Sequence, residues 1–412
     1  MTSEPAAAVE EVWREESPRL LGALLRITRD VGRAEDLAQE ALAQALAQWP
    51  ATGVPDNPAA WLMTTARRRA IDQLRAGERQ LRAYAEMSAT TVDAYEESFA
   101  VDHVEDDVLR LMFVCCHPSL TDDTRTVLTL RLVAGLSSRE IARAYLTSEA
   151  TVATRISRAK RTLADAGAAL EEPTGPERAA RLGSVLAVLY LLFNEGYAAT
   201  AGVDWTRPAL CAEAVRVTRQ LVAVVPLEAE AHGLLALLEL QSSRLAARVD
   251  TAGEPILLAD QDRTAWDRVA IDRGVSALEA ARRLGGDGPY VLQATIAAEH
   301  ARADSVEATD WVRVAALYEQ LARVTGSVVV ELNRAVALGM AHGPATGLAL
   351  ADLVAEQPGM SDYHLLPAVR GDLLERLGRR EEAAAEFRRA ASLATNERER
   401  ALLNRRAERV AP

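Results

Sequence analysis

Apolar residues recur every three or four positions along most of the chain, which is the spacing of one face of an α-helix. Residues 9–49 predict two such helices, interrupted at Asp30-Val31-Gly32. Residues 50–58 hold three prolines and a glycine, and they predict a loop. A further helix starts at Asn57 or Pro58, because proline fits the first turn of a helix.

The middle of the chain predicts a linker followed by a second group of helices. Residues 83–107 are polar, acidic towards their end and weakly periodic, so we expect a linker there. Periodicity returns at Val108 and is interrupted by a proline break at Pro118. Three helical blocks follow, at residues 122–133, 138–145 and 150–166.

The C-terminal half predicts one helix after another. A second linker at Glu171–Pro176 holds two prolines and a glycine. Residues 363–394 resemble one helix pair of the tetratricopeptide type, in which small residues such as Gly371 sit opposite a large apolar residue such as Phe387. Weaker units lie at residues 311–340 and 341–357. The pattern therefore predicts an all-α fold with domains at residues 1–82, 108–170 and 177–412.

Composition supports the helical prediction and bounds the cellular location. Hydrophobic residues make up 49% of the chain but aromatic residues only 4%, a balance that favours helices. No apolar stretch reaches the roughly 18–20 residues that a membrane span needs. The acidic, alanine-rich N-terminus lacks the pattern of a signal peptide. We therefore expect a cytoplasmic protein that does not use a membrane.

The net charge of −12 argues against a protein that binds nucleic acid strongly by itself. Two short stretches are nevertheless basic, one from Arg67 to Arg82 and one from Arg155 to Arg161. Basic faces on an acidic body predict a protein that meets DNA with the help of a partner.

The three cysteines predict neither a disulfide framework nor a metal site. Cys115-Cys116-His117 has no second ligand pair at zinc spacing, since Cys211 is distant. We interpret the adjacent pair as small buried thiols that end a helix before Pro118. The chain also lacks a Ser-His-Asp arrangement, and His300 and His364 stand alone in the sequence. We expect no cofactor, no metal and no enzymatic activity.

Residues 137–163 predict a helix-turn-helix. Ser137 or Ser138 caps a short first helix, a turn follows at residues 146–149, and Val152 and Ile156 begin the buried stripe of the second helix. Hydroxyl and basic side chains on that helix can contact bases and phosphates of duplex DNA. The alternative is an ordinary helical hairpin with solvated arginines. The candidate DNA-binding residues are Thr151, Thr154, Arg155, Arg158 and Lys160.

Residues 61–75 combine aromatic, hydroxyl and basic side chains on one helix, a mixture that can hold single-stranded bases by stacking and backbone contacts. In the alternative interpretation Trp61 belongs to the core and the arginines face solvent. At least one arginine of Arg67–Arg69 is expected to be structural, because three in a row sweep around the helix. The candidate single-strand contacts are Trp61, Thr64, Arg67, Arg68 and Arg75.

These pieces, in this order, resemble a bacterial sigma factor of the extracytoplasmic-function (ECF) type. Residues 32–49 resemble the helix of sigma region two that docks on RNA polymerase. Residues 57–75 resemble the part that recognises and opens the −10 promoter element, and residues 120–164 resemble region four, which reads the −35 element. The absence of regions one and three implies the ECF branch. The resemblance implies polymerase contacts at Glu35, Asp36, Gln39 and Glu40.

Three further stretches resemble one ECF subgroup with a C-terminal tetratricopeptide-like extension: residues 109–118, 192–197 and 260–267. In that subgroup the extension is thought to regulate the factor in place of a membrane anti-sigma protein. Its partner would be a regulatory protein or a ligand. One departure is Ala153, where many relatives carry a basic residue, so a phosphate contact is missing there.

The resemblance implies a protein without covalent chemistry, whose partners are core RNA polymerase and promoter DNA. Two alternatives stay open. One is a DNA-binding regulator that never contacts polymerase, and the other is a scaffold in which the helix-turn-helix only packs. The stretches at residues 193–197 and 260–267 either line a ligand or partner pocket or form buried corners that hold helices together.

Overall fold

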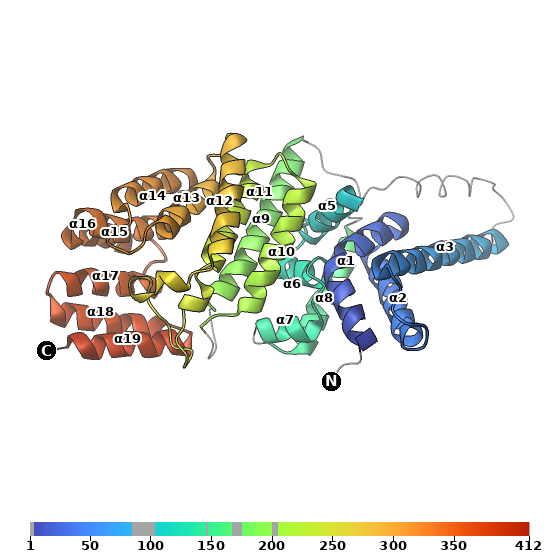
Figure 1. The fold of residues 1–412 in the computed structure, drawn as a ribbon, viewed down its shortest axis with the longest axis horizontal. Helices are drawn as coiled ribbons and strands as arrows, with labels where there is room; N and C mark the ends of the chain where they lie inside the picture. Colours follow the sequence, from blue (N-terminus) through green and yellow to red (C-terminus); the bar gives the residue numbers. More distant parts are fainter. Residues whose placement is uncertain (1–3, 85–103, 146, 167–174, 200–204, 412) are drawn as a thin grey trace. The chain divides into compact units, whose positions relative to one another are not determined.

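The computed structural model describes residues 4–84, 104–145, 147–166, 175–199 and 205–411 (Figure 1). Within these ranges the chain is helical, and the only β-type pairing is a single bridge between Val249 and Pro255. The all-α prediction is confirmed. The chain forms two compact units, unit 1 at Met1–Leu189 and unit 2 at Tyr190–Pro412.

Three long helices open unit 1: α1 at Glu4–Thr28, α2 at Val31–Thr52 and α3 at Pro58–Tyr84. The predicted break between the first two is confirmed, because Asp30 caps α2 and its carboxylate accepts from the Arg33 backbone N–H. Asn57 caps α3 in the same way, accepting from the Ala60 N–H at 2.9 Å.

The loop predicted at residues 50–58 is shorter than expected. Pro50 lies in the last turn of α2, where a missing N–H removes only one helical hydrogen bond. Trp49 before it is 1% exposed, so packing holds this turn in place. The helix stops at Gly53, whose φ of +83° suits glycine.

Four helices follow in unit 1: α5 at Val104–Cys115, α6 at Asp122–Leu132, α7 at Ser138–Ala144 and α8 at Glu149–Asp165. The predicted linker at residues 83–107 overlaps the end of α3 and the start of α5, and the part between them, residues 85–103, lies outside the described residues. Helix α9, Gly175–Tyr197, runs across the boundary at Leu189, whereas the sequence places the domain boundary at residues 171–176.

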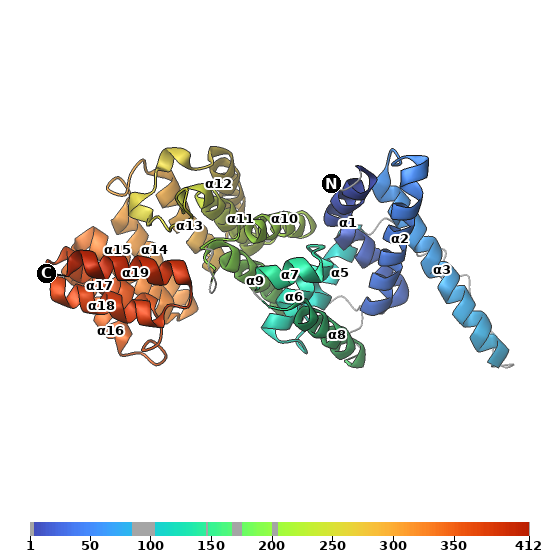
Figure 2. The ribbon, with the colours of Figure 1, turned by 90° about the horizontal axis from the view of Figure 1, so that it is seen from below.

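Unit 2 continues with helices whose neighbours in sequence pack against each other (Figures 1 and 2). They are α10 Pro208–Val224, α11 Ala229–Ser242, α12 Arg268–Arg283, α13 Pro289–Arg302, α14 Trp311–Thr325, α15 Val328–His342, α16 Pro344–Ala355, α17 Leu365–Arg376, α18 Arg380–Leu393 and α19 Glu397–Val410. Three short 3₁₀ turns, η1 Leu245–Ala247, η2 Leu258–Asp260 and η3 Arg263–Ala265, lie between α11 and α12.

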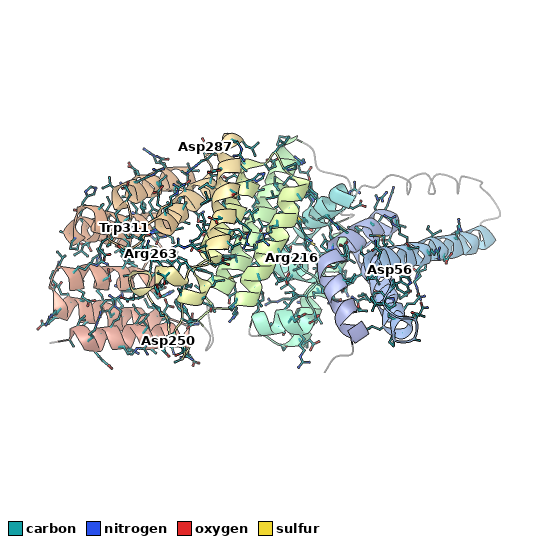
Figure 3. The ribbon with its side chains drawn as sticks, in the orientation of Figure 1. Asp56, Arg216, Asp250, Arg263, Asp287 and Trp311 are labelled. Carbon is teal, nitrogen blue, oxygen red and sulfur yellow. The ribbon has the colours of Figure 1, made fainter. Side chains whose placement is uncertain are left out.

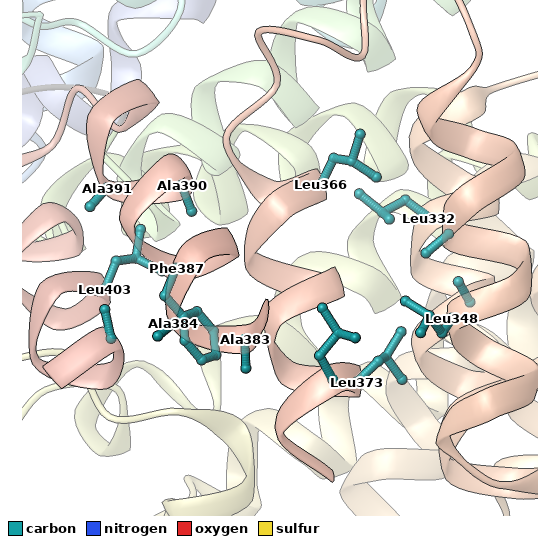
Figure 4. Close-up of a cluster of buried hydrophobic side chains, with 14 of the residues drawn as sticks. Leu332, Leu348, Leu366, Leu373, Ala383, Ala384, Phe387, Ala390, Ala391 and Leu403 are labelled. Carbon is teal, nitrogen blue, oxygen red and sulfur yellow. The ribbon is translucent and has the colours of Figure 1, made fainter. Parts of the chain in front are cut away.

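The segment at residues 363–394 forms the helix pair α17 and α18, and the predicted small-against-large contact is present. A Cβ on Gly371 would lie 2.7 Å from the ring of Phe387, which is fully buried. Leu332, Leu366 and Leu373 extend this apolar cluster (Figure 4). That these pairs are tetratricopeptide repeats stays a prediction.

No helix in the described part of the chain is long and apolar enough to cross a membrane.

Candidate functional site

The helix-turn-helix of residues 137–163 is held by local capping interactions. Ser137 and Glu140 form a capping box, in which the Ser137 backbone N–H donates to the Glu140 carboxylate at 2.8 Å and the Glu140 N–H donates to the Ser137 hydroxyl at 3.2 Å. Ser148 caps α8, accepting from the Thr151 N–H at 3.1 Å. The first helix begins at Ser138 as predicted, and the second begins at Glu149, one residue before the predicted start.

Helix α8 buries one face and leaves the opposite face exposed. Val152 and Ile156 are 1% and 7% exposed, as the predicted stripe requires. On the other face four of the five candidate residues form one continuous exposed stripe: Thr151, Thr154, Arg155 and Arg158. Arg161, which sequence reasoning left out of the site, is exposed one turn further along.

Lys160 does not share the exposed stripe of α8. It lies nine residues after Thr151, which at about 100° per residue is half a turn away. Its ammonium contacts the carboxylate of Glu35 at 2.5 Å. The structure thus joins a predicted DNA contact to a predicted polymerase contact, and neither faces outward.

Glu35 is 5% exposed and is held by two cations. Arg131 on α6 donates to its Oε1 at 2.7 Å through Nε, and Lys160 reaches Oε2. Burial alone would raise the pKa of Glu35, but the attraction of Arg131 and Lys160 outweighs it and lowers that pKa. We call Glu35, Arg131 and Lys160 the Glu35 cluster.

Sequence reasoning missed Arg131, although its position carries a signal. It stands between Leu130 and Leu132, which are 0% and 1% exposed, in the most apolar part of α6. A charged residue there needs a partner, because an unpaired buried charge is costly.

The other candidate polymerase contacts lie on the surface of α2. Asp36 and Gln39 are exposed, and they share one face with Glu40. The Glu40 carboxylate pairs with Arg69 of α3 at 2.6 Å, in an ion pair whose two side chains are about two-fifths exposed. The Arg69 guanidinium also donates to the Gln44 side chain. Arg69 is therefore the structural arginine expected among residues 67–69.

Helix α3 presents four of the five candidate single-strand contacts along one stripe. Thr64, Arg68 and Arg75 are exposed, and they follow Trp61 at helical spacing. Arg67 lies about a third of a turn away and is half-buried, with no hydrogen-bond partner for its Nε in the described part of the chain.

Trp61 is half-buried and packs edge-on against Trp49, with ring centroids 5.6 Å apart. One part of the ring therefore belongs to the core and another part is open to solvent. The core interpretation thus holds for the packed part of the ring, and a role in holding single-stranded bases stays a prediction.

A second charged contact joins the first helices of unit 1 to the later ones. Asp107 on α5 is 1% exposed and pairs with Arg26 of α1 at 3.1 Å and with Arg110 at 3.3 Å. A Cβ on Gly22 would lie 2.5 Å from the Asp107 carbonyl oxygen, so α1 and α5 are in direct backbone contact. The Trp13 indole N–H also donates to the Gly135 carbonyl at 2.9 Å.

Cys115 and Cys116 are buried free thiols at the end of α5, as interpreted from the sequence. Burial raises the pKa of Cys116 to about 12, so it stays protonated and is a poor metal ligand at neutral pH. Among the described residues no three His, Cys, Asp or Glu side chains are arranged to hold a metal ion.

The two motifs of unit 2 meet in space. The hydroxyl of Tyr197 and the ring of Trp266 both contact the guanidinium of Arg244. Asp267 caps α12, accepting from two backbone N–H groups, which is the structural role weighed for this stretch.

Comparison with known families matches three parts of the chain. Residues 12–80 match Sigma-70 region 2, and residues 110–163 match Sigma-70, region 4. Residues 181–282 match a family of unknown function, DUF6596.

An uncharacterized protein of Rhizobium meliloti, R00370, is 44% identical over 96% of this chain and 94% of its own length. The ECF RNA polymerase sigma factor SigK of Mycobacterium sp. strain KMS is 32% identical over 34% of this chain and 72% of the relative. SigK of Mycobacterium tuberculosis H37Ra is 29% identical over 38% and 84%. No solved structure matches the chain.

Proposed function

Because the chain belongs to the ECF sigma factors of RNA polymerase, we propose that it recognises the −35 and −10 promoter elements and helps to open the DNA. Core polymerase supplies the catalysis, so the chain itself is not an enzyme, and it works in the cytoplasm. Polymerase also supplies much of the affinity for DNA that a chain of net charge −12 lacks.

The observation that carries the proposal is the exposed stripe of α8. Thr151, Arg155 and Arg158 stand together on a helix whose opposite face is buried, and the capped turn before it presents its N-terminal half. Arginine can pair bidentately with guanine in the major groove. We assign the −35 element to this stripe, which also includes Thr154, while Lys160 lies on the other side of the helix.

The −10 element is assigned to α3. The open part of the Trp61 ring offers a stacking surface for an unpaired base, and Arg68 and Arg75 on the same stripe can follow the backbone. Thr64 lies between them, and Arg67 is half-buried at the edge of this surface.

Core polymerase binding is assigned to the exposed face of α2, at Asp36, Gln39 and Glu40. Glu35 completes this face only if the Glu35 cluster opens. We infer that the described arrangement is a closed form of the factor. In this form Glu35 and Lys160 pair with each other, and therefore Glu35 does not contact polymerase and Lys160 does not contact DNA. Polymerase and DNA would then compete with the ion pairs of the cluster.

Run-off transcription with core polymerase and a library of randomised −35 and −10 cassettes tests the main proposal. We expect the full chain to select a defined promoter motif, and Arg155→Ala with Arg158→Ala to lower the transcript about tenfold or more. Arg380→Ala on α18 removes an equally exposed positive charge and is the control. If the full chain yields no transcript and does not bind core polymerase, the proposal is wrong.

Duplex binding measured without polymerase separates the two alternatives. A DNA-binding regulator would give no transcript but bind a defined duplex tightly, whereas a sigma factor binds its selected promoter weakly alone. A scaffold would be indifferent to the substitutions at Arg155 and Arg158.

The closed form has its own test in core polymerase binding. Lys160→Gln removes one ion pair of the Glu35 cluster, and we expect about fivefold tighter binding to core. Arg161→Gln removes the neighbouring exposed charge and leaves the cluster intact, so its affinity should not change. Weaker binding by Lys160→Gln would contradict the closed form.

We also propose that unit 2 regulates the factor, as the subgroup resemblance implies, through a protein or a ligand. Comparing residues 1–189 with the full chain in the transcription assay tests this. The cut at Leu189 keeps the part of α9 that belongs to unit 1. Equal activity of both forms at every template would contradict regulation by unit 2.

A further inference from the structure

Unit 2 contains a cavity of about 470 Å³, a size typical of small-molecule sites. Helices α11, α13, α14 and α15 form its walls, together with Tyr190 at the start of unit 2. Much of the wall is apolar, from residues such as Leu237, Ile296 and Leu321. Neutral polar groups, including Gln293 and Asn333, complete it.

Arg244 is the one charged side chain among the described residues that line this cavity. Its guanidinium donates to the Tyr197 hydroxyl and to the Gln241 side-chain oxygen at 2.7 Å. It also lies over the rings of Tyr197 and Trp266, with centroid distances of 5.7 and 5.6 Å. All of these partners are neutral, so the charge of Arg244 is not balanced by them.

Two further arginines lie near Arg244, against the rings of Tyr197 and Trp266. Arg248 lies 3.7 Å from the centroid of the Tyr197 ring. Arg263, 7% exposed, donates to the carbonyl oxygens of His300 and Ala303, both at 2.7 Å. None of the three arginines forms an ion pair within the described residues, although Glu307 and Asp304 act on Arg263 from farther away.

Several polar atoms at this end also lack hydrogen-bond partners in the described part of the chain. They are Nε of Arg244, Nε of Arg248, Nε1 of Trp266 and Nδ1 of His300. The His300 ring packs edge-on against that of Trp311, with centroids 5.2 Å apart. Trp311 and Arg263 are labelled in Figure 3. Burial and the charges of Arg244 and Arg263 lower the pKa of His300 to about 4, so its ring is neutral at pH 7. His300, alone in the sequence, is thus a neutral polar group beside the positive charges of Arg244 and Arg263.

Uncompensated positive charge inside a protein of net charge −12 is costly unless something balances it. No carboxylate lines the described cavity, and the acids Glu307 and Asp304 act on Arg263, not on Arg244. We propose that the cavity binds a small amphipathic organic anion, with its charged head at Arg244 and its apolar body between α11, α13 and α14. The two motifs at residues 192–197 and 260–267 build the charged end of this site.

Binding of an anion in this cavity does not depend on whether the chain acts as a sigma factor. Only the idea that the anion regulates transcription rests on the proposed function. The test of the cavity therefore measures binding alone, on the full chain and without polymerase. The probe is 8-anilinonaphthalene-1-sulfonate, an aromatic anion, titrated by fluorescence. The uncharged dye N-phenyl-1-naphthylamine has the same rings without the sulfonate and reports the apolar part of the site.

We expect one saturable site per chain for the anionic dye. Arg244→Gln should weaken its binding about tenfold or more, while binding of the uncharged dye changes little. Arg380→Gln removes one exposed positive charge on α18 and should leave both dyes unaffected. If Arg244→Gln binds both dyes as the unaltered chain does, or the anion binds only at many weak sites, the proposal is overturned.

A second variant protects the test against misfolding of Arg244→Gln. Asn333 is an exposed residue of α15 that lines the cavity, far along the chain from the arginines. Asn333→Trp should obstruct the cavity and abolish binding of both dyes, with the circular-dichroism spectrum and melting temperature unchanged. Full binding of the anionic dye by a folded Asn333→Trp would place the dye elsewhere and overturn the proposal.

Discussion

Unit 1 buries a negative charge between two positive ones, whereas unit 2 gathers three arginines whose direct hydrogen-bond and ring partners are neutral. Glu35 has Arg131 and Lys160 within 2.7 Å. The groups in contact with Arg244, Arg248 and Arg263 include a side-chain amide, an aromatic ring and a backbone carbonyl. Both arrangements withdraw charge from water, but only the first one holds it in direct ion pairs, and in the described part of the second only Arg263 has acids, Glu307 and Asp304, acting on it.

The difference separates two uses of buried charge. In the Glu35 cluster each group needs the others, because removing one partner leaves a charge that neither water nor protein balances. Among the described residues no negative charge contacts Arg244. Its removal should therefore change the free energy of unfolding little, and an anionic ligand that binds there should gain binding free energy. Stability measurements on matched variants of the two units can break or sharpen this comparison.

The largest expected effect is the loss of Arg131. Arg131→Met leaves Glu35 buried with Lys160 alone, and we expect unit 1 to lose about 3 kcal/mol of unfolding free energy. Arg244→Met should change the stability of unit 2 by less than about 1 kcal/mol, since lost hydrogen bonds are offset by removal of an unbalanced charge.

Buried thiols allow each unit to be measured separately. Cys115 and Cys116 lie in unit 1 and Cys211 in unit 2, and all are buried. Thiol labelling in urea, in a Cys211→Ala background for unit 1 and a Cys115→Ala/Cys116→Ala background for unit 2, gives the two unfolding free energies. Equal losses for Arg131→Met and Arg244→Met would contradict the comparison.

Acid should destabilise the two units in different pH ranges. The pKa of His300 is about 4 in the folded chain, against an ordinary histidine value of 6.5, so the unfolded chain takes up the proton first. The stability of unit 2 should therefore fall by roughly 3 kcal/mol between pH 6.5 and pH 4. The pKa of Glu35 is lowered, so its contribution to unit 1 is lost only as the pH falls below 4.5.

His300→Gln isolates this effect, because glutamine does not titrate. Unfolding of unit 2 is followed in the Cys115→Ala/Cys116→Ala background by labelling Cys211 with 2,2′-dipyridyl disulfide, which reacts with thiols in acid as well as at pH 7. It should show a flatter pH dependence in the variant. An unchanged slope would mean that other groups set the acid sensitivity of unit 2.

A moderate effect is expected where α1 and α5 touch. A Cβ on Gly22 would lie 2.5 Å from the Asp107 carbonyl, so Gly22→Ala must separate these helices and disturb the Asp107 ion pairs. We expect a loss of about 2 kcal/mol in unit 1. Gly183→Ala in α9 is the matched control, since its Cβ meets no atom within 4 Å and alanine favours the helix.

The smallest effect is expected for an exposed pair. Arg69 and Glu40 are joined at 2.6 Å, but their side chains are about two-fifths exposed. Arg69→Ala should cost unit 1 less than about 0.5 kcal/mol, because water screens both charges. A loss comparable to that of Arg131→Met would show that exposure is not what distinguishes the two pairs.

Local signals in the sequence were enough to predict most helices and their starts. The Asp30 and Asn57 caps, the capping box at Ser137 and the buried stripe of α8 all depend on residues within a few positions of each other. The same reasoning misplaced the end of α2, because burial of Trp49 outweighs the local cost of Pro50.

Helical spacing also predicted which side chains share a face of a helix, but not which residues of other helices contact that face. The stripe from Thr151 to Arg158 follows from the period of the helix, and so does the position of Lys160 half a turn away. That Lys160 meets Glu35, 125 positions earlier in the chain, follows only from the packing of α8 near α2. Contacts of this kind carry no local sequence signal, because folding and not spacing brings their partners together.

The charged end of the cavity shows the same division. Tyr197 and Trp266 stood out in the sequence as parts of two motifs, whereas Arg244 did not, and all three meet only in the folded unit 2. Residue types and periodicity thus determine that unit 2 is a set of amphipathic helices. The packing of α11 against its neighbours decides where their polar residues converge, because burial is set by the whole unit and not by any one helix.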